Sequence, residues 1–192
     1  MKVTKLVFAI AFISSQVAAE ECKVKHLEKL EYTDIECQFY MGTAAYRNEV
    51  YSVAAAHWEY LLSLEAKYKG DNQTQAIAKS TLNYLRYHGL GIIQDRNTAV
   101  RHWLNSAKSG VLEARRHLGF AYSDENFEHK NLVTALGWYR SILTIYPNAD
   151  ELDENDKNIH LDVTREIREL EGKLSKEQIN ASEKFAKSVL FK

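Results

Sequence analysis

The sequence has little proline and cysteine, and its charge is balanced. Its 192 residues include one proline, Pro147, and two cysteines. With so little proline, long helices can run without interruption. Lysine and arginine number 25 against 26 aspartate and glutamate, which gives a formal net charge of −1. A chain so balanced has neither the basic surface that nucleic acids attract nor the cationic cluster that holds an anionic membrane.

Long hydrophobic runs are also missing, apart from one at the start. Lys2 and Lys5 precede the apolar run from Leu6 to Ile13, and Val17-Ala18-Ala19 offers small residues before Glu20. The run is too short to cross a bilayer core of about 30 Å. The order of these features predicts a cleaved secretory signal peptide over residues 1–19, and so a periplasmic protein whose mature chain has no membrane span. An N-terminal anchor or a buried helix is the alternative.

The two cysteines, Cys22 and Cys37, both lie near the expected mature N-terminus. In an exported protein an even cysteine count predicts a disulfide. The bond would tie residues 20–37 to the first repeat helix and stabilise the fold by about 3 kcal/mol in the chain-entropy model. A metal pair or a redox pair is the alternative, although the spacing matches neither a CxxC motif nor a zinc cluster.

The chain repeats itself at an offset of 36 residues and shows helical rather than alternating periodicity. Small and large residues recur in register: Ala78 with Ala114, Leu82 with Leu118, Ala99 with Ala135, and Trp103 with Tyr139. A helix-turn-helix unit at such a period is typical of an α-solenoid. We therefore expect an all-α fold in which alanines allow close helix crossings and the large residues fill the space between layers.

The middle unit carries a recognisable motif. It reads Leu82-x-x-Leu85-x-x-x-Gly89-x-Gly91, then Ala99-Val100-x-x-Trp103-x-x-x-Ala107. This resembles the Sel1-like repeat, a tetratricopeptide-like unit with a glycine-rich turn. The resemblance implies a short α-solenoid of about three Sel1-like repeats over residues 38–146.

The first and third units depart from the pattern. In the third, Glu125 and Phe127 replace the turn glycines, so we expect a changed turn that offers a specialised surface. In the first, over residues 39–62, the spacing to the next unit is longer, and the extra residues predict a long polar loop at about 66–75.

Residues 147–192 are expected to form an acidic linker followed by capping helices. An amphipathic pattern over residues 159–170 precedes Gly172, and Ser175 with Gln178 forms a capping box for the last helix. Solenoids need such terminal helices to cover their last apolar layer.

Catalytic motifs are absent from the sequence. It contains no GxSxG, HExxH or SxxK. His57 and His102 hold equivalent repeat positions, which favours a bulky ring in the packing over a row of ligands. We therefore expect no enzyme, with no catalytic, cofactor-binding or metal residues and no cofactor. A hydrolase of the cysteine-rich Sel1-repeat β-lactamase type is the alternative, although that subgroup has a cysteine pair in each unit.

Aromatic residues are frequent, with eleven tyrosines and three tryptophans, and aromatics anchor many binding surfaces. The candidates for a partner-binding face are Tyr84, Arg86, Tyr87, His88, Arg101 and Tyr122. The alternative is that they are ordinary core residues of the repeat.

We therefore hypothesise that the protein is an adaptor or scaffold that binds an envelope protein or peptide and does not bind nucleic acid. A structural oligomer is a further alternative. Within the family, this chain is similar in size, export signal and repeat content to the periplasmic Sel1-repeat component of the sodium-driven polar flagellar motor. Its two cysteines are placed differently from those of that component.

Overall fold

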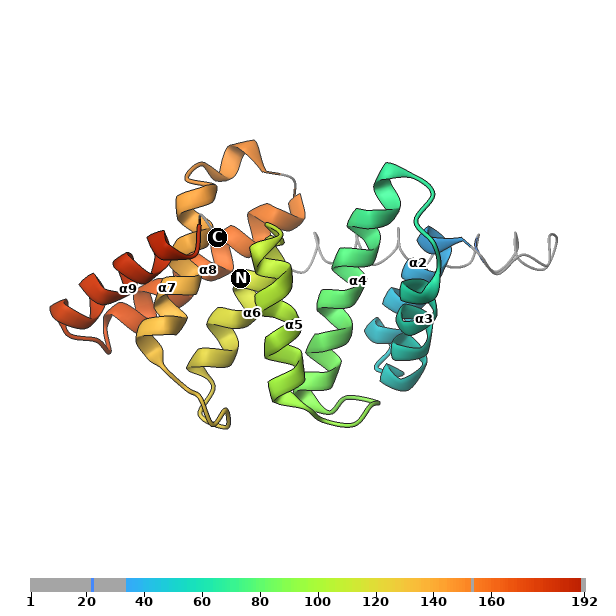
Figure 1. Ribbon diagram of the computed structural model, residues 1–192, viewed down its shortest axis with the longest axis horizontal. Helices are drawn as coiled ribbons and strands as arrows, with labels where there is room; N and C mark the ends of the chain where they lie inside the picture. The colour runs from blue at the N-terminus through green and yellow to red at the C-terminus, as the bar shows by residue number, and fades with distance from the viewer. Residues whose placement is uncertain (1–21, 23–33, 153, 191–192) are drawn as a thin grey trace, which may run out of the picture. The chain divides into compact units, whose positions relative to one another are not determined.

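The computed structural model describes residue 22, residues 34–152 and residues 154–190, and every regular element in this part of the chain is helical (Figure 1). The expected signal peptide, residues 1–19, lies outside the described residues. The all-α prediction is confirmed. The helices are α2 (Ile35–Arg47), α3 (Tyr51–Ser63), α4 (Lys69–His88), α5 (Arg96–Lys108), α6 (Leu112–Ser123), α7 (Leu132–Ile145), η1 (Ala149–Glu151), α8 (Glu154–Glu171) and α9 (Lys176–Ser188).

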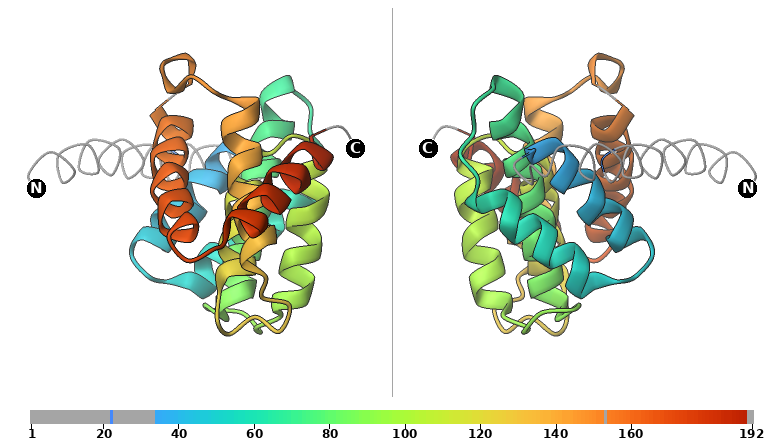
Figure 2. Two further views of the ribbon diagram at one scale, coloured as in Figure 1. Left: turned by 90° about the vertical axis from the view of Figure 1, so that its left-hand side faces the viewer. Right: turned by 90° about the vertical axis from the view of Figure 1, so that its right-hand side faces the viewer.

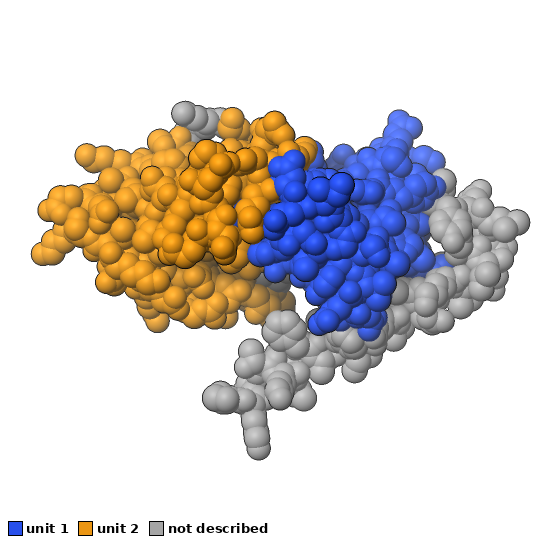
Figure 3. Space-filling model, turned by 90° about the horizontal axis from the view of Figure 1, so that it is seen from below, with its two compact units in different colours: residues 1–95 blue, residues 96–192 orange. Residues whose placement is uncertain are grey.

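The chain divides into two compact units, residues 1–95 and 96–192 (Figure 3). The boundary at Asp95 falls in the turn of the middle repeat, between α4 and α5. Each unit has its own apolar core, and each is described by itself.

In unit 1, α2 and α3 form a hairpin whose close approach depends on Gly42. A Cβ atom at Gly42 would lie 2.4 Å from Nε1 of Trp58. Trp58 is buried and donates from Nε1 to the carbonyl of Phe39 at 3.4 Å. The missing side chain on α2 therefore makes the space that the largest aromatic of α3 fills.

The α3–α4 connection is shorter than predicted. The prediction of a long polar loop at about residues 66–75 is wrong, because α4 begins at Lys69. Asp71 explains the early start: its Oδ2 accepts hydrogen bonds from the backbone N–H groups of Lys67 at 2.8 Å and Tyr68 at 2.9 Å. A carboxylate in the first turn satisfies donors that a helix start leaves unpaired. No proline interrupts the polar residues that follow.

The glycine-rich turn after α4 is required by both backbone conformation and space. Gly89 ends α4 in the left-handed region at φ 72°, and Gly91 follows at φ 68°. A Cβ atom at Gly91 would lie 2.3 Å from the backbone nitrogen of Ser52. The turn therefore packs its backbone directly on the start of α3, as only glycine allows.

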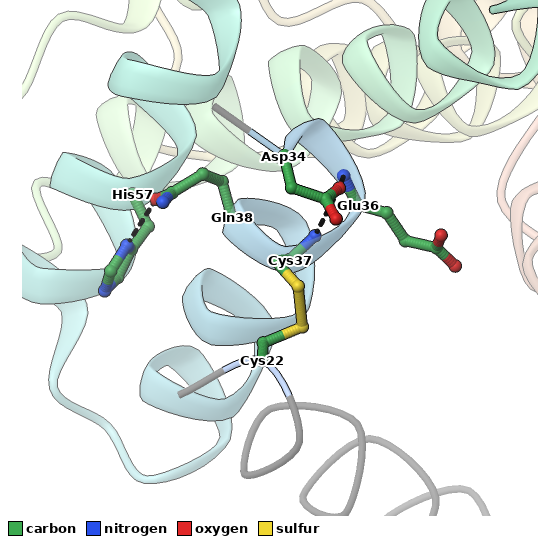
Figure 4. The surroundings of a disulfide bond; sticks show 6 residues. All are labelled: Cys22, Asp34, Glu36, Cys37, Gln38 and His57. Atoms are coloured by element: carbon green, nitrogen blue, oxygen red, sulfur yellow. Dashed lines mark hydrogen bonds between the residues drawn. A yellow bond between two sulfur atoms is a disulfide. The ribbon is translucent and has the colours of Figure 1, made fainter. Parts of the chain in front are cut away.

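The predicted disulfide is confirmed: Cys22 is bonded to Cys37 in α2 (Figure 4). Asp34 begins α2, where its Oδ1 accepts from the backbone N–H of Glu36 at 2.9 Å and of Cys37 at 3.3 Å. On another side of α2, Gln38 Oε1 lies 2.8 Å from Nδ1 of His57 in α3. In this repeat the ring of His57 is thus part of the packing between two helices.

Unit 2 contains the rest of the repeat array. Ala99, Ala114 and Ala135 are completely buried, as is Ala78 at the equivalent position in unit 1. A Cβ atom at Gly119 in α6 would lie 2.3 Å from the ring of Tyr139 in α7. The helix-turn-helix repeat and the small residues at its close contacts are confirmed.

Two further helices, α8 and α9, pack on α7 (Figure 2). The apolar stripe of α8 is buried as predicted, and the capping box is present at the start of α9, where Ser175 N–H donates to Gln178 Oε1 at 2.9 Å. Arg140 of α7 joins the two helices. Its guanidinium donates to the Ile179 carbonyl and Ser182 Oγ of α9, and to Glu171 Oε1 at the end of α8. The buried stripe consists of Ile159, Val163, Ile167 and Leu170.

Within the described residues, no helix is long and apolar enough to cross a membrane.

Candidate functional site

A groove with a volume of about 390 Å³ opens in unit 2, and we refer to it as the unit-2 groove. Its walls come from α5, α6, α7 and α9 and from the turn between α6 and α7. Most of the side chains that line it are apolar or aromatic. The lining residues are Leu104, Lys108, Tyr122, His129, Asn131, Thr134, Trp138, Phe185 and Val189.

Trp138 is the most buried aromatic in this lining, with 5% of its surface exposed. No described residue accepts a hydrogen bond from its indole Nε1–H, although that nitrogen is buried. A buried donor without an acceptor costs free energy in the folded chain. The nitrogen has almost no accessible surface, so Trp138 lines the groove through its other atoms.

Arg115 supports Trp138 from within the fold. Its guanidinium carbon lies 5.7 Å from the centre of the Trp138 ring. The same group donates to Ser141 Oγ at 3.0 Å, to the Ala107 carbonyl at 3.0 Å and to the Val189 carbonyl at 3.3 Å. Arg115 thus links α6 to the C-terminal ends of α5 and α9, where the last carbonyls of a helix favour a cation.

The α9 wall of the groove depends on Gly137. A Cβ atom at Gly137 would lie 2.4 Å from Cδ1 of Phe185 and 3.1 Å from the Ser182 carbonyl. Without that atom, α9 approaches α7 closely, and Phe185 lies edge-on to Trp138 with ring centres 5.5 Å apart. A pair of crossed aromatic rings forms this end of the groove.

The turn between α6 and α7 forms one rim and is built without glycine. Asp124 Oδ1 accepts from the backbone N–H of Asn126 at 2.9 Å, and buried Phe127 packs edge-on to Tyr122 at 5.8 Å. Asn131 caps α7 by accepting from the Thr134 N–H at 3.0 Å. The altered turn predicted from Glu125 and Phe127 therefore borders the groove, with Phe127 as its anchor.

The described lining of the groove includes basic side chains and no acidic ones. None of the nine described lining residues is acidic, while Lys108 and His129 are bases. His129 is exposed and lies 3.5 Å from Glu128. Lys108 is exposed at the end of α5. The groove thus combines aromatic walls with hydrogen-bond donors and a cation.

Of the six predicted binding residues, Tyr122 lines this groove. A tyrosine hydroxyl is protonated at neutral pH, and burial raises the pKa of this one further. Arg101 is exposed on α5 and donates to Thr98 Oγ1 at 2.7 Å, but it is not part of the lining.

The other four predicted residues lie on α4 in unit 1. The Tyr84 ring packs against His88 at 4.4 Å and against Tyr46 at 6.4 Å, within the aromatic packing of that unit. Arg86 donates to Asn83 Oδ1 at 2.6 Å. These contacts show Tyr84, Arg86 and His88 in intramolecular packing, and their role in binding stays a prediction.

Tyr87 needs a correction. We expected it on an accessible face, but its side chain is completely buried. The reason is that α4 is buried on two faces. Leu82 and Leu85 belong to one face, and Ser80, Asn83 and Tyr87 recur at spacings of three and four on the other. Hydrophobic periodicity identifies an apolar helix face. The second buried face of α4 includes polar residues such as Asn83, so periodicity does not reveal it.

Eight of the nine lining residues are not among the predicted binding residues, and those that matter most for the groove are Lys108, Trp138, Phe185 and Val189. One signal was available for Trp138, which stands where the other two repeats have His57 and His102. We interpreted that position as core filler. The sequence predicts that the last capping helix packs Phe185 and Val189 against the preceding unit, but it does not show that this helix borders a groove.

A buried ionic network lies next to the repeat core and does not line the groove. Glu113 is 3.2 Å from Nε2 of His117 and also pairs with Arg116. Burial raises the pKa of Glu113, but His117 and Arg116 outweigh it and lower the pKa to about 2. Burial lowers the pKa of His117, which stacks on Trp103 with ring centres 4.7 Å apart. A neutral imidazole held between an indole and a carboxylate is a packing element.

Metal binding has no visible site in the part of the chain that the structure describes. No group of three or more histidine, cysteine, aspartate or glutamate side chains there is placed to hold an ion.

The comparisons with known proteins identify the fold. No family model matches the chain, and no curated protein matches it. Among solved structures, it is similar to a protective antigen present in uropathogenic Escherichia coli strains, whose crystal structure displays an SLR (Sel1-like repeat) fold. The identity is 18%, the TM-score is 0.60, and the match covers 82% of this chain. The chain has the Sel1-like repeat fold. It spans about 30% of the length of that antigen, and at this identity the likeness concerns the Sel1-like repeat fold alone.

Proposed function

We propose that this protein is a Sel1-like repeat scaffold that binds a segment of another protein in the unit-2 groove. The observation that carries the proposal is the groove itself, whose lining joins the aromatic rings of Tyr122, Trp138 and Phe185 to Leu104 and Val189. Helical-repeat folds provide binding surfaces of this kind without catalytic groups. The groove volume is in the range of sites that take a few side chains.

We further propose that the scaffold works in the periplasm. The Cys22–Cys37 disulfide supports this location, because such bonds persist in oxidising compartments. The signal-like order of residues 1–19 agrees with it. Assignment to the polar flagellar motor stays a prediction from size, export signal and repeat content, and the comparisons do not add to it.

Site-specific photo-crosslinking in the living envelope tests the proposal. A photoreactive phenylalanine analogue replaces Thr134, which lines the groove, and in a control it replaces Glu169, an exposed residue of α8 outside the lining. We expect one discrete protein adduct from position 134 and none from position 169. Equal adducts from both positions, or none from position 134, would overturn the proposal.

Two alternatives predict other results. A hydrolase of the β-lactamase type would turn over a chromogenic β-lactam, and we expect no turnover by the purified protein. A structural oligomer would give an adduct of twice the chain mass from position 134 and a multiple of the monomer mass by light scattering.

A further inference from the structure

The lining of the unit-2 groove also indicates what kind of segment it binds. This inference rests on the proposed function and concerns the chemistry of the partner. The relevant facts are the hydrogen-bonding character of the lining groups, their charge and the size of the apolar space between them.

Two polar side chains of the lining supply donors, Asn131 and Lys108, while the side chains of Tyr122, His129 and Thr134 can donate or accept. Asn131 uses its side-chain oxygen to cap α7, which leaves its NH₂ group as a donor. Lys108 adds an ammonium group with three donors. A complementary ligand therefore presents acceptors.

The charge of the lining favours acceptors that are anionic. The whole chain has a small excess of acidic residues, at 26 against 25, and yet none of the nine described lining residues is acidic. Two carboxylates of the neighbouring turn already have partners: Glu125 pairs with Lys130, and Glu128 accepts from Asn97 at 2.6 Å and lies 3.5 Å from His129. Lys108 is thus the positive group against which a partner's carboxylate can be placed.

The apolar part of the lining sets a second requirement. Tyr122, Trp138 and Phe185 supply aromatic surface, and Leu104 and Val189 supply aliphatic surface. Because burial of apolar area drives most association, a ligand that fills this space needs an apolar side chain as its anchor.

We propose that the unit-2 groove binds an acidic, apolar peptide segment of a protein partner. One aliphatic or aromatic side chain enters between Trp138 and Phe185. A backbone carbonyl accepts from the Asn131 NH₂ group, and an adjacent carboxylate pairs with Lys108. A basic segment would meet Lys108 with like charge, and a purely apolar one would leave the donors unpaired.

Binding to three synthetic peptides tests this chemistry on the full mature chain with its disulfide intact. The peptides are unstructured nonapeptides with one central leucine flanked by glutamate, by glutamine or by lysine. Affinity is measured by fluorescence anisotropy. We expect the glutamate peptide to bind about tenfold more tightly than the glutamine peptide and the lysine peptide to bind most weakly. Equal affinity for the three peptides would overturn the inference.

The site of binding is read from the indole N–H signals in nitrogen-15 NMR spectra. The three tryptophans give three such signals, and we expect only that of Trp138 to move on addition of the glutamate peptide. An unchanged Trp138 signal in the presence of bound peptide would overturn the placement.

A charge reversal provides the sharpest variant. Lys108→Glu should lower affinity for the glutamate peptide by roughly tenfold and make the lysine peptide the better ligand. The matched control is Lys173→Glu, an exposed lysine outside the groove, which should leave the order of affinities unchanged. Lys108 is exposed at a helix end, so its replacement does not disturb the core.

The identity of the segment crosslinked from position 134 distinguishes a failure of this inference from a failure of the proposed scaffold function. An envelope protein crosslinked from position 134 whose contacting segment is basic would leave the scaffold function standing and overturn the acidic-peptide inference. A crosslinked second copy of the chain would overturn both.

Discussion

Individual glycines decide which helices of this protein can lie close together. Gly42, Gly119 and Gly137 each occupy a helix surface where a Cβ atom would lie within 2.4 Å of an aromatic ring on the partner helix. The ring that packs against each glycine belongs to Trp58, Tyr139 and Phe185, respectively. The pairing of a missing side chain with a ring is thus the basic contact of both units.

Gly119→Ala tests this contact. The added Cβ would lie 2.3 Å from the Tyr139 ring, which is buried and cannot move away without displacing α7. We expect a loss of about 1–3 kcal/mol in the free energy of unfolding, measured by urea denaturation. The control is Gly70→Ala in α4, where nothing lies within 4 Å of the added atom. It should be neutral or stabilising by up to about 1 kcal/mol, and equal losses for both would contradict the explanation.

At the scale of secondary-structure elements, Arg140 adds polar contacts to the packing of α9 on α7, and the disulfide ties α2 to Cys22. Both attachments involve side chains that are distant in sequence from their partners. They therefore strengthen the attachment of α2 and α9, while the helices themselves form from local signals such as the capping box at Ser175.

Replacement of Arg140 by alanine should loosen α9. It removes donors to Ser182 Oγ at 2.9 Å and to Glu171 at 2.6 Å, and the arginine side chain is 17% exposed. We expect a loss of about 1–3 kcal/mol and faster amide hydrogen exchange across α9. Arg165→Ala, which removes an exposed ion pair with Asp162 on α8, should change stability by less than about 1 kcal/mol. If α9 keeps its protection in the Arg140 variant, packing alone holds it.

Reduction of the Cys22–Cys37 bond should weaken unit 1. The bond closes a loop with a sequence separation of 15, for which the chain-entropy model gives about 3 kcal/mol. We expect earlier urea unfolding of α2 and α3, measured by hydrogen exchange, for the reduced chain and for a Cys22→Ser, Cys37→Ser variant. The Trp138 indole signal serves as the reference for unit 2 and should not change. Equal loss of protection in both units would contradict a local effect.

At the scale of the whole molecule, the buried network of Glu113 and His117 links stability to pH. Burial keeps the pKa of His117 below its ordinary value of 6.5. The unfolded chain takes up this proton below about pH 6.5 while the folded chain does not, so stability falls as the pH decreases through that range. The pKa of Glu113, lowered to about 2, acts in the same direction between about pH 4.5 and pH 2. The groups facing this pair are Arg116, Trp103 and, from α8, Asp162.

Urea unfolding at pH 7.5 and pH 5.5 measures this dependence. The folded chain should be less stable at pH 5.5, by at most about 1.4 kcal/mol per pH unit for the proton of His117. His117→Gln should flatten the dependence in this interval, whatever its own effect on stability. The control is His129→Gln, at an exposed residue on the groove rim, which should keep the wild-type slope. An unchanged slope in the His117 variant would show that other groups carry the effect.

What the sequence by itself determined are the features set by local chemistry and by repetition. Alanines at a 36-residue offset, the glycine turn at Gly89 and Gly91, the Ser175 capping box and the paired cysteines all predicted structure correctly. The tertiary structure alone decided the groove, because its lining runs from Leu104 to Val189 and converges only when α9 packs against α7 across Gly137. It also decided that Tyr87 is buried, since burial on a second face of α4 depends on neighbours that periodicity does not reveal.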